Sequence, residues 1–189
     1  AQRLPPHLFS AQAVANIGWA LAVFDIADDD ELNAWYWPLV KRTSRHMQPV
    51  HFRQLHQLLL TCAHADCRPS HIDEVVLDGI RADGLKAYTE ASAVFTSSLL
   101  QQEVARDLRL LGHDVEEEWV HQGTGLSLDI YLPQLNLGIE VDGPSHYARN
   151  CRQPLGSTVL KHRLFRNLGL SLCVVPYWEW QVLSLRAKG

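Results

Sequence analysis

The chain has 189 residues, of which 47% are hydrophobic, and its formal net charge is −4. This length suits one large domain or two small ones. The negative charge gives no global attraction to nucleic acid, so any such contact must come from a local patch. No apolar run approaches the length of a transmembrane helix. The four scattered cysteines argue against a disulfide scaffold and for a reducing compartment. No targeting segment is visible, and a first residue other than Met is typical of a processed or partial chain.

The first half of the sequence, residues 1–93, predicts helices only. Ser10 is a suitable N-cap for a first helix, a second helix should begin near Asp30, and Pro49 suits the start of a third. A fourth should begin at Ser70. Apolar residues recur at helical spacing in each segment. Those expected to face the core are Val14, Ile17, Leu21, Phe24, Leu32, Trp35, Leu39, Val40, Phe52, Leu55, Leu59, Cys62, Ile72, Val75, Val76 and Ile80.

The first and third helices match each other at an offset of 38 residues. Under this offset Val14 corresponds to Phe52, Asn16 to Gln54, Ile17 to Leu55 and Leu21 to Leu59. A self-similar helix pair at this period predicts a helical repeat region. Chance similarity between two amphipathic helices is the alternative.

Two further groups in this half have a functional and a structural interpretation. Cys62, His64, Cys67 and His71 could bind zinc, but their spacing is looser than that of a zinc knuckle, which favours a buried cysteine beside surface polar residues. The aromatic run at 35–37 could stack on bases, although we expect core packing for Trp35 at least.

The second half changes to the order helix, three strands, helix, strand. A helix should run from about residue 97 and end at Gly112, and a first strand should cover about 117–121. The next two strands, SLDIYL and LGIEVDG, flank a turn that contains Pro133 and Asn136. An amphipathic helix then ends at Gly169, and the continuous apolar run LSLCVVP predicts a buried central strand. A short helix should close the chain.

The strand pair carries three carboxylates, those of Asp129, Glu140 and Asp142. Because side chains alternate along a strand, Glu140 and Asp142 share one face, while Ile139 and Val141 face the core. Carboxylates in an apolar setting are costly to bury without a partner. A metal ion, a nucleic-acid backbone or a basic partner would explain them.

This order of elements resembles the restriction-endonuclease-like fold. The resemblance implies that Asp129 and Glu140 occupy the positions of the acids that hold a divalent metal beside the scissile phosphate. It also places Glu103 where some members add another acid. If the chain were a nuclease, Mg²⁺ would be the expected cofactor, polarising the phosphate and activating water.

The sequence departs from that family at two positions. Leu128 stands where the motif carries proline, and Asp142 stands where the catalytic lysine belongs. A third carboxylate can bind metal but cannot do the work of a lysine. Lys161 on the next helix could replace it, since some relatives take this lysine from a helix. Whether the chain is an enzyme stays open, and the degenerate site argues against it.

A narrower resemblance covers residues from about Ser97 to the C-terminus. The blocks LDIYLPQLNLGIEVDGPSHY, TVLKHRLFRNLG and VVPYWEW, in this order, resemble a RAP domain. RAP domains resemble nuclease folds and occur mainly in organellar RNA-processing or translation proteins, often after helical repeats. The preceding helices resemble octotricopeptide repeats and the helical region of FAST-kinase-like RNA-binding proteins.

A basic stretch follows the carboxylates. From Gly143 to Trp178 there is no acidic residue, which favours contact with RNA phosphates over this segment. An ordinary amphipathic helix with a solvated basic face is the alternative. The candidate RNA-binding residues are His146, Arg149, Arg152, Lys161, Arg163 and Arg166.

The sequence therefore predicts an α+β chain, with a helical repeat region at 1–93 and a small α/β, restriction-endonuclease-like RAP domain at 97–189. We expect an RNA-binding protein that holds structured or fragmented RNA, as a ribosomal accessory subunit or an RNA-processing or stability factor. Its expected location is the mitochondrion or, alternatively, the chloroplast. The expected partners are rRNA or an organellar transcript and ribosomal proteins, with no membrane, no small-molecule substrate and no required cofactor. The alternatives are a metal-dependent endoribonuclease using Asp129, Glu140, Asp142 and Lys161, and a protein-interaction scaffold.

Overall fold

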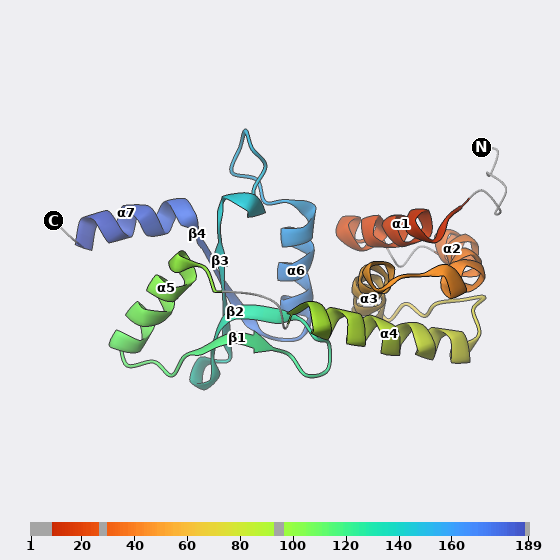
Figure 1. Ribbon diagram of the computed structural model, residues 1–189, viewed down its shortest axis with the longest axis horizontal. Coiled ribbons are helices and arrows are strands. Elements are labelled where there is room, and N and C mark those ends of the chain that lie inside the picture. The colour runs from red at the N-terminus through yellow and green to blue at the C-terminus, as the bar shows by residue number, and fades with distance from the viewer. Residues whose placement is uncertain (1–8, 27–29, 93–96, 188–189) are drawn as a thin grey trace. The chain divides into compact units, whose positions relative to one another are not determined.

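The computed structural model describes residues 9–26, 30–92 and 97–187, and it divides into two compact units (Figure 1). Unit 1 covers residues 1–91 and unit 2 covers residues 92–189. The described residues confirm the predicted α+β class, with helices in unit 1 and a four-stranded sheet in unit 2. None of the described helices combines the length and apolarity needed to cross a membrane.

The described part of unit 1 contains α1 (Ala11–Phe24), α2 (Asp30–Thr43), α3 (Pro49–His64) and α4 (Glu74–Ser92). Ser10 caps α1, because its hydroxyl accepts a hydrogen bond from the amide of Ala13 at 3.1 Å. Pro49 occupies the first turn of α3, where its missing N–H is not needed. The fourth helix begins at Glu74 rather than at the predicted Ser70.

Helices α1 and α3 pack side by side in unit 1. Asn16 and Gln54, which the 38-residue offset pairs, share a hydrogen bond of 3.0 Å. Gln12 and His51 form a second polar contact between the two helices at 2.9 Å. The first contact therefore joins positions that the 38-residue offset makes equivalent, whereas the second joins positions 39 residues apart.

The core of unit 1 differs from the prediction at several positions. Tyr36 and Trp37 are each 1% exposed, whereas Trp35 is only half-buried against Phe9. Gly18 allows Tyr36 to approach α1, since a Cβ at Gly18 would overlap the tyrosine hydroxyl, which donates to the carbonyl of Val14 at 2.8 Å.

Two apolar positions expected in this core, Phe24 and Val75, are exposed. Several others are only half-buried, namely Ile17, Phe52, Ile72 and Val76. Because α4 begins at Glu74, Ile72 precedes that helix. Leu77 and Ile80 fill the inner face of α4 instead. The side chain of Leu32 lies outside the described residues.

Unit 2 follows the predicted order of elements. These are α5 (Leu99–Leu110), β1 (Glu116–Val120), β2 (Ser127–Leu132), β3 (Leu137–Asp142), α6 (Gly156–Asn167), β4 (Ser171–Pro176) and α7 (Tyr177–Ala187). The strands lie in the order β1-β2-β3-β4. The first two pairings are antiparallel, and β3 pairs with β4 in parallel after the crossover through α6.

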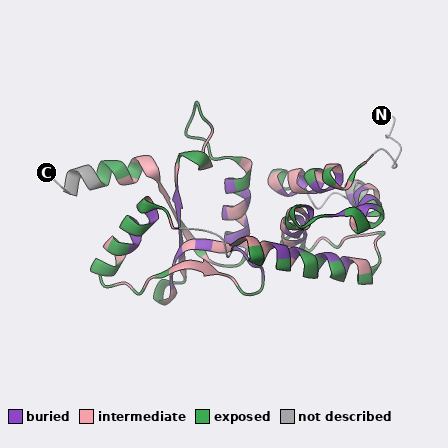
Figure 2. Ribbon diagram, in the orientation of Figure 1, coloured by how far each residue is buried: buried purple, intermediate pink, exposed green. Residues whose placement is uncertain are grey.

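Strand β3 is buried on both faces, with α5 on one side and α6 on the other (Figures 1 and 2). Ile139 and Val141 pack with Val104 and Ala105 of α5. Leu99, by contrast, is exposed at the start of α5. The opposite face of β3 carries Gly138, Glu140 and Asp142 toward α6, so the sheet places two carboxylates inside the unit.

Strand β4 lies at the edge of the described sheet, which corrects the prediction of a central strand. Ser171 and Cys173 are exposed and the residues between and after them are half-buried. A continuous apolar run is compatible with a central strand and with an edge strand. Here the crossover through α6 places β4 beside β3, and no described strand pairs with the other side of β4.

Candidate functional site

A buried polar cluster lies between β3 and α6. Alternation along β3 turns Glu140 and Asp142 toward α6, where consecutive residues Lys161 and His162 meet them. Glu140 is 1% exposed and Asp142 is fully buried. His146, in the short helix η4 (Pro144–His146) after β3, reaches the same cluster.

Glu140 forms an ion pair with Lys161. The Lys161 ammonium lies 2.7 Å from Oε2 of Glu140, and the lysine side chain is 26% exposed. The other carboxylate oxygen, Oε1, is buried without a hydrogen-bond partner. Burial raises the pKa of Glu140 to about 7 despite the opposing charge of Lys161, and the carboxylates of Asp129 and Asp142 add to the rise.

Asp142 is surrounded by donors. Nδ1 of His146 lies 3.0 Å from Oδ1, the Tyr147 hydroxyl donates to Oδ2 at 3.2 Å, and Nε2 of His162 lies 3.6 Å from Oδ2. Burial acts to raise the pKa of Asp142, but these neighbours outweigh it and lower the pKa. In turn, the hydrogen bond to Asp142 raises the pKa of His146, whereas burial lowers the pKa of His162. Asp142 is therefore held as a carboxylate. Of the two histidines beside it, His146 favours its own protonated form and His162 favours its own neutral form.

Asp129 and Glu103 each accept a hydrogen bond from outside this cluster. Oδ2 of Asp129 accepts a hydrogen bond from the amide of Val141 at 2.7 Å. The backbone pairing of β2 with β3 ends at Ile130 and Ile139, and this side-chain hydrogen bond continues the contact between the two strands. Glu103 on α5 accepts from the indole N–H of Trp180 at 3.1 Å. Among the described residues, the group able to surround a metal ion is instead Glu140, Asp142 and His162.

His162 is the member of this group that sequence reasoning missed as a ligand. It stands next to Lys161, and the helical spacing of Leu160 and Leu164 places position 162 near the buried face of α6. This spacing is typical of a buried position, but it does not show that Asp142 lies opposite His162.

The candidate RNA-binding residues differ in their surroundings. Lys161 and His146 contact the buried carboxylates, while Arg149, Arg152 and Arg166 are exposed. Arg163 is half-buried.

An aromatic group lies beside one of the exposed arginines, Arg152. The guanidinium of Arg152 lies over the ring of Trp178 at 5.0 Å, and Tyr147 packs edge-on against the same ring at 4.5 Å. Tyr147 thus touches both this aromatic group and Asp142.

A cavity of about 260 Å³ lies at the start of α6, lined by Ser145, His146, Ser157, Thr158 and Lys161. The first turn of α6 has no side-chain cap and no acidic residue. Backbone N–H groups at such a helix start, together with hydroxyls and two basic side chains, are suited to an anion.

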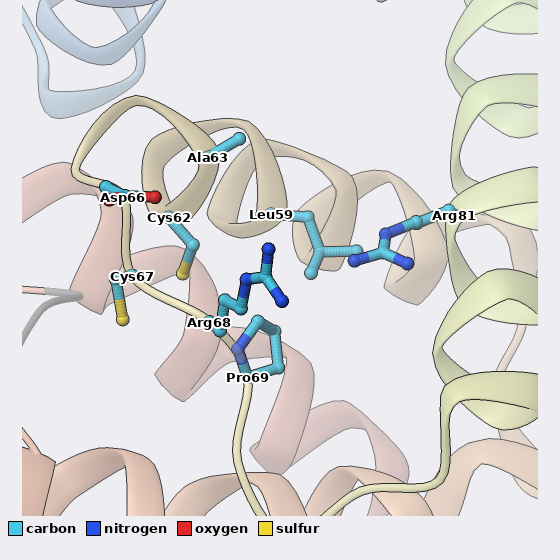
Figure 3. A pocket seen from close by; sticks show the side chains of 8 residues that line it. All are labelled: Leu59, Cys62, Ala63, Asp66, Cys67, Arg68, Pro69 and Arg81. Carbon is cyan, nitrogen blue, oxygen red and sulfur yellow. The ribbon is translucent and has the colours of Figure 1, made fainter.

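The possible zinc ligands of unit 1 do not form such a group within the described residues. Cys62 and Cys67 line a pocket together with the guanidinium-bearing side chains of Arg68 and Arg81 (Figure 3). His64 and His71 do not line it. The thiol of Cys67 accepts a hydrogen bond from Asn33 at 3.0 Å.

Residues 139–188 match the family model of the RAP domain. The RAP-domain prediction is confirmed for these residues. The matched segment begins in β3 and contains Glu140, Asp142, Lys161 and His162, whereas Glu103 and Asp129 precede it.

A curated relative extends the similarity into unit 1. The chain is 27% identical over 183 residues to "RAP domain-containing protein, chloroplastic" of Oryza sativa subsp. japonica. The alignment covers 93% of this chain and 28% of that protein. The chain therefore spans little more than a quarter of the length of this relative.

Proposed function

We propose that this chain binds RNA through a surface formed by the loop at 147–155 and the exposed side of α6. The observation that carries the proposal is the group of exposed arginines, Arg149, Arg152 and Arg166, in a stretch without acidic residues from 143 to 178. The RAP-domain match covers this whole stretch. The resemblance to RAP domains implies RNA as the partner.

The arginines are better placed for RNA than Lys161 and His146. Glu140 and Asp142 compensate much of the charge on those two side chains, whereas the exposed arginines can pair with phosphates from solvent. Arg152 stacked on Trp178 offers both a charge and a flat surface. Guanidinium and indole planes of this kind stack on bases that are not paired in a duplex. Single-stranded or structured RNA with exposed bases is therefore the proposed ligand.

An organellar setting and repeat helices belong to the same proposal. The relative is described as chloroplastic, which supports an organellar location, in the chloroplast or the mitochondrion. The contact between Asn16 and Gln54 at equivalent positions of α1 and α3 supports an octotricopeptide-like pair of repeats. Two such repeats would read few bases, which suits a protein that holds rRNA or a transcript together with ribosomal or other proteins.

The test is RNA binding by the full chain at several salt concentrations. Replacing Arg149 and Arg152 together by Ala should weaken binding. It should also reduce the slope of log affinity against log salt by about 1 for each phosphate that an arginine no longer neutralises. Arg152→Lys should keep the salt slope and lose affinity, because lysine does not stack in the same way.

Arg106→Ala is the matched control. Arg106 is an exposed arginine of unit 2 on α5, paired with Asp107 at 2.8 Å, and its loss should leave RNA affinity unchanged. If the double variant binds as tightly as the original chain with the same salt slope, the proposed surface is wrong.

A metal-dependent endoribonuclease is the second candidate, favoured by one contact. Lys161 from α6 lies 2.7 Å from Glu140, so a lysine does reach the carboxylates despite Asp142 at the usual lysine position. Cleavage of RNA in Mg²⁺ or Mn²⁺ that Asp129→Asn, Glu140→Gln or Lys161→Met abolishes would establish this activity. RNA binding that survives EDTA, without cleavage in either metal, would leave binding as the function.

A further inference from the structure

Three buried side chains of the RAP domain converge without satisfying one another. One potential ligand atom from each of Glu140, Asp142 and His162 lies within 4.8 Å of the others. Oε1 of Glu140 and Nε2 of His162 are buried and have no hydrogen-bond partner. Nε2 of His162 stops 3.6 Å from Oδ2 of Asp142, beyond the usual reach of a hydrogen bond.

Such an arrangement is unfavourable unless something fills it. Buried polar atoms in folded proteins are nearly always paired, and each unpaired one carries the full penalty of desolvation. Here one carboxylate oxygen and one ring nitrogen, from two different elements, are unpaired, and both belong to side chains of this close group. A cation between them would satisfy both and would balance the two carboxylates.

We propose that Glu140, Asp142 and His162 bind one divalent transition-metal ion, Mn²⁺ or Zn²⁺. An imidazole nitrogen beside two carboxylates suits these ions, whereas Mg²⁺ and Ca²⁺ prefer oxygen ligands throughout. Three protein ligands leave further positions for water or another group. This proposal concerns metal binding alone and does not depend on RNA binding.

The surroundings of the three residues hold them in place. Asp142 is oriented by the Tyr147 hydroxyl and by His146, in the way that outer hydrogen bonds orient metal-binding carboxylates. Lys161 contacts Oε2 of Glu140, while Oε1 keeps no hydrogen-bond partner and is open to a metal ion. The ammonium of Lys161 repels a metal ion at Glu140. In this proposal the metal ion displaces the lysine side chain toward solvent, which the partial exposure of Lys161 allows.

This ligand set differs from the one that the nuclease resemblance implies. That set relies on Asp129 and Glu140, but Oδ2 of Asp129 already accepts from the amide of Val141. His162 on α6 takes the place of Asp129. The two sets share Glu140, so variants of Asp129 and His162 discriminate between them.

The test measures metal binding by the full chain after chelation and removal of the chelator. We expect one Mn²⁺ or Zn²⁺ per chain by equilibrium dialysis with elemental analysis, and we expect Mg²⁺ to compete poorly in the Mn²⁺ titration. His162→Gln and Glu140→Gln should each raise the Kd at least tenfold, because each removes a direct ligand. Asp129→Asn should leave the Kd within about twofold, since in this proposal Asp129 does not contact the ion.

His64→Gln is the matched control, an exposed histidine of unit 1 near the two cysteines there. It should not change the Kd. Circular dichroism checks that each variant keeps its fold, and a wild-type measurement covers any variant that does not: Zn²⁺ should shift the ¹⁵N resonances of the His162 ring at one equivalent. The proposal is overturned if the wild-type chain binds no ion stoichiometrically, or if the His162 resonances do not move. Loss of binding in Asp129→Asn or His64→Gln, with His162→Gln unaffected, would also overturn it.

Discussion

The carboxyl group of Glu140 is buried inside unit 2, where its charged form is unfavourable. Its pKa rises from 4.5 to about 7, mainly because burial disfavours the charged form. The folded chain therefore holds this proton more tightly than the unfolded chain does. Its contribution to stability is fully present below pH 4.5 and is lost as the pH rises through about 7.

Replacing Glu140 by Gln should remove this pH dependence. In metal-free buffer, the free energy of unfolding of the original chain should fall relative to that of Glu140→Gln as the pH rises from 4.5 to about 7. The difference should be at most about 3 kcal/mol, since each pKa unit corresponds to about 1.4 kcal/mol. Urea unfolding at several pH values measures it. Parallel stability curves for the two chains would contradict the assigned role of burial.

The chemistry of single positions was predictable where it depended on near neighbours in the sequence. Strand alternation predicted that Glu140 and Asp142 share one face, and both do face away from Ile139 and Val141. His162 was not recognised, because its meaning depends on Asp142, twenty residues away and on another element.

At the scale of elements, two helical glycines have opposite reasons to be glycine. A Cβ at Gly18 of α1 would overlap the Tyr36 hydroxyl, whereas a Cβ at Gly79 of α4 would meet nothing within 4 Å. Gly18 therefore serves the packing of α1 on α2. Gly79 costs helix stability with no described packing gain.

Gly18→Ala should destabilise unit 1 and Gly79→Ala should stabilise it. The second change should add about 0.5–1 kcal/mol, the ordinary difference in helix propensity. The first should cost more than that gain, because Tyr36 must leave the carbonyl of Val14. Tyr36→Phe, which removes the overlapping hydroxyl, should recover part of the loss in a double-mutant cycle measured by thermal unfolding. Additive effects of the two changes would show that the overlap with Tyr36 is not the cause.

The order of helices and strands followed from local patterns, and the elements that were misplaced depended on contacts between distant segments. Gly112 ends α5 as expected, since helix termination is a local property, and Ser98 caps its start. The apolar run of β4 could not show that the strand lies at the edge, because that depends on which strands pair with β3. Likewise, Tyr36 rather than Trp35 is buried because Gly18 leaves room for it on a different helix.

At the scale of the whole molecule, the RAP match begins inside a structural unit. The matched segment starts at Ile139 in β3, whereas unit 2 starts at residue 92. Val104 and Ala105 of helix α5 and Ile130 of strand β2 complete the core around β3. The matched residues alone therefore lack much of their own core.

A fragment of residues 97–189 should fold cooperatively, and a fragment of residues 139–189 should not. The longer fragment keeps the complete described sheet and α5, while the shorter one exposes Ile139 and Val141 to water. Circular dichroism with thermal unfolding distinguishes them. A cooperative transition in the shorter fragment would show that β3, α6, β4 and α7 fold without α5, β1 and β2.

Tyr147 gives the buried carboxylates and the exposed aromatic group a common side chain. Its hydroxyl donates to Asp142 and its ring packs on Trp178, beneath Arg152. If an ion at Asp142 alters the position of Tyr147, it alters the surface that we propose for RNA. By thermodynamic reciprocity, RNA must then change the affinity for the ion by the same factor. Tyr147→Phe removes the hydrogen bond to Asp142 and keeps the ring that packs on Trp178. In this variant the affinity for the ion and the affinity for RNA should no longer depend on each other.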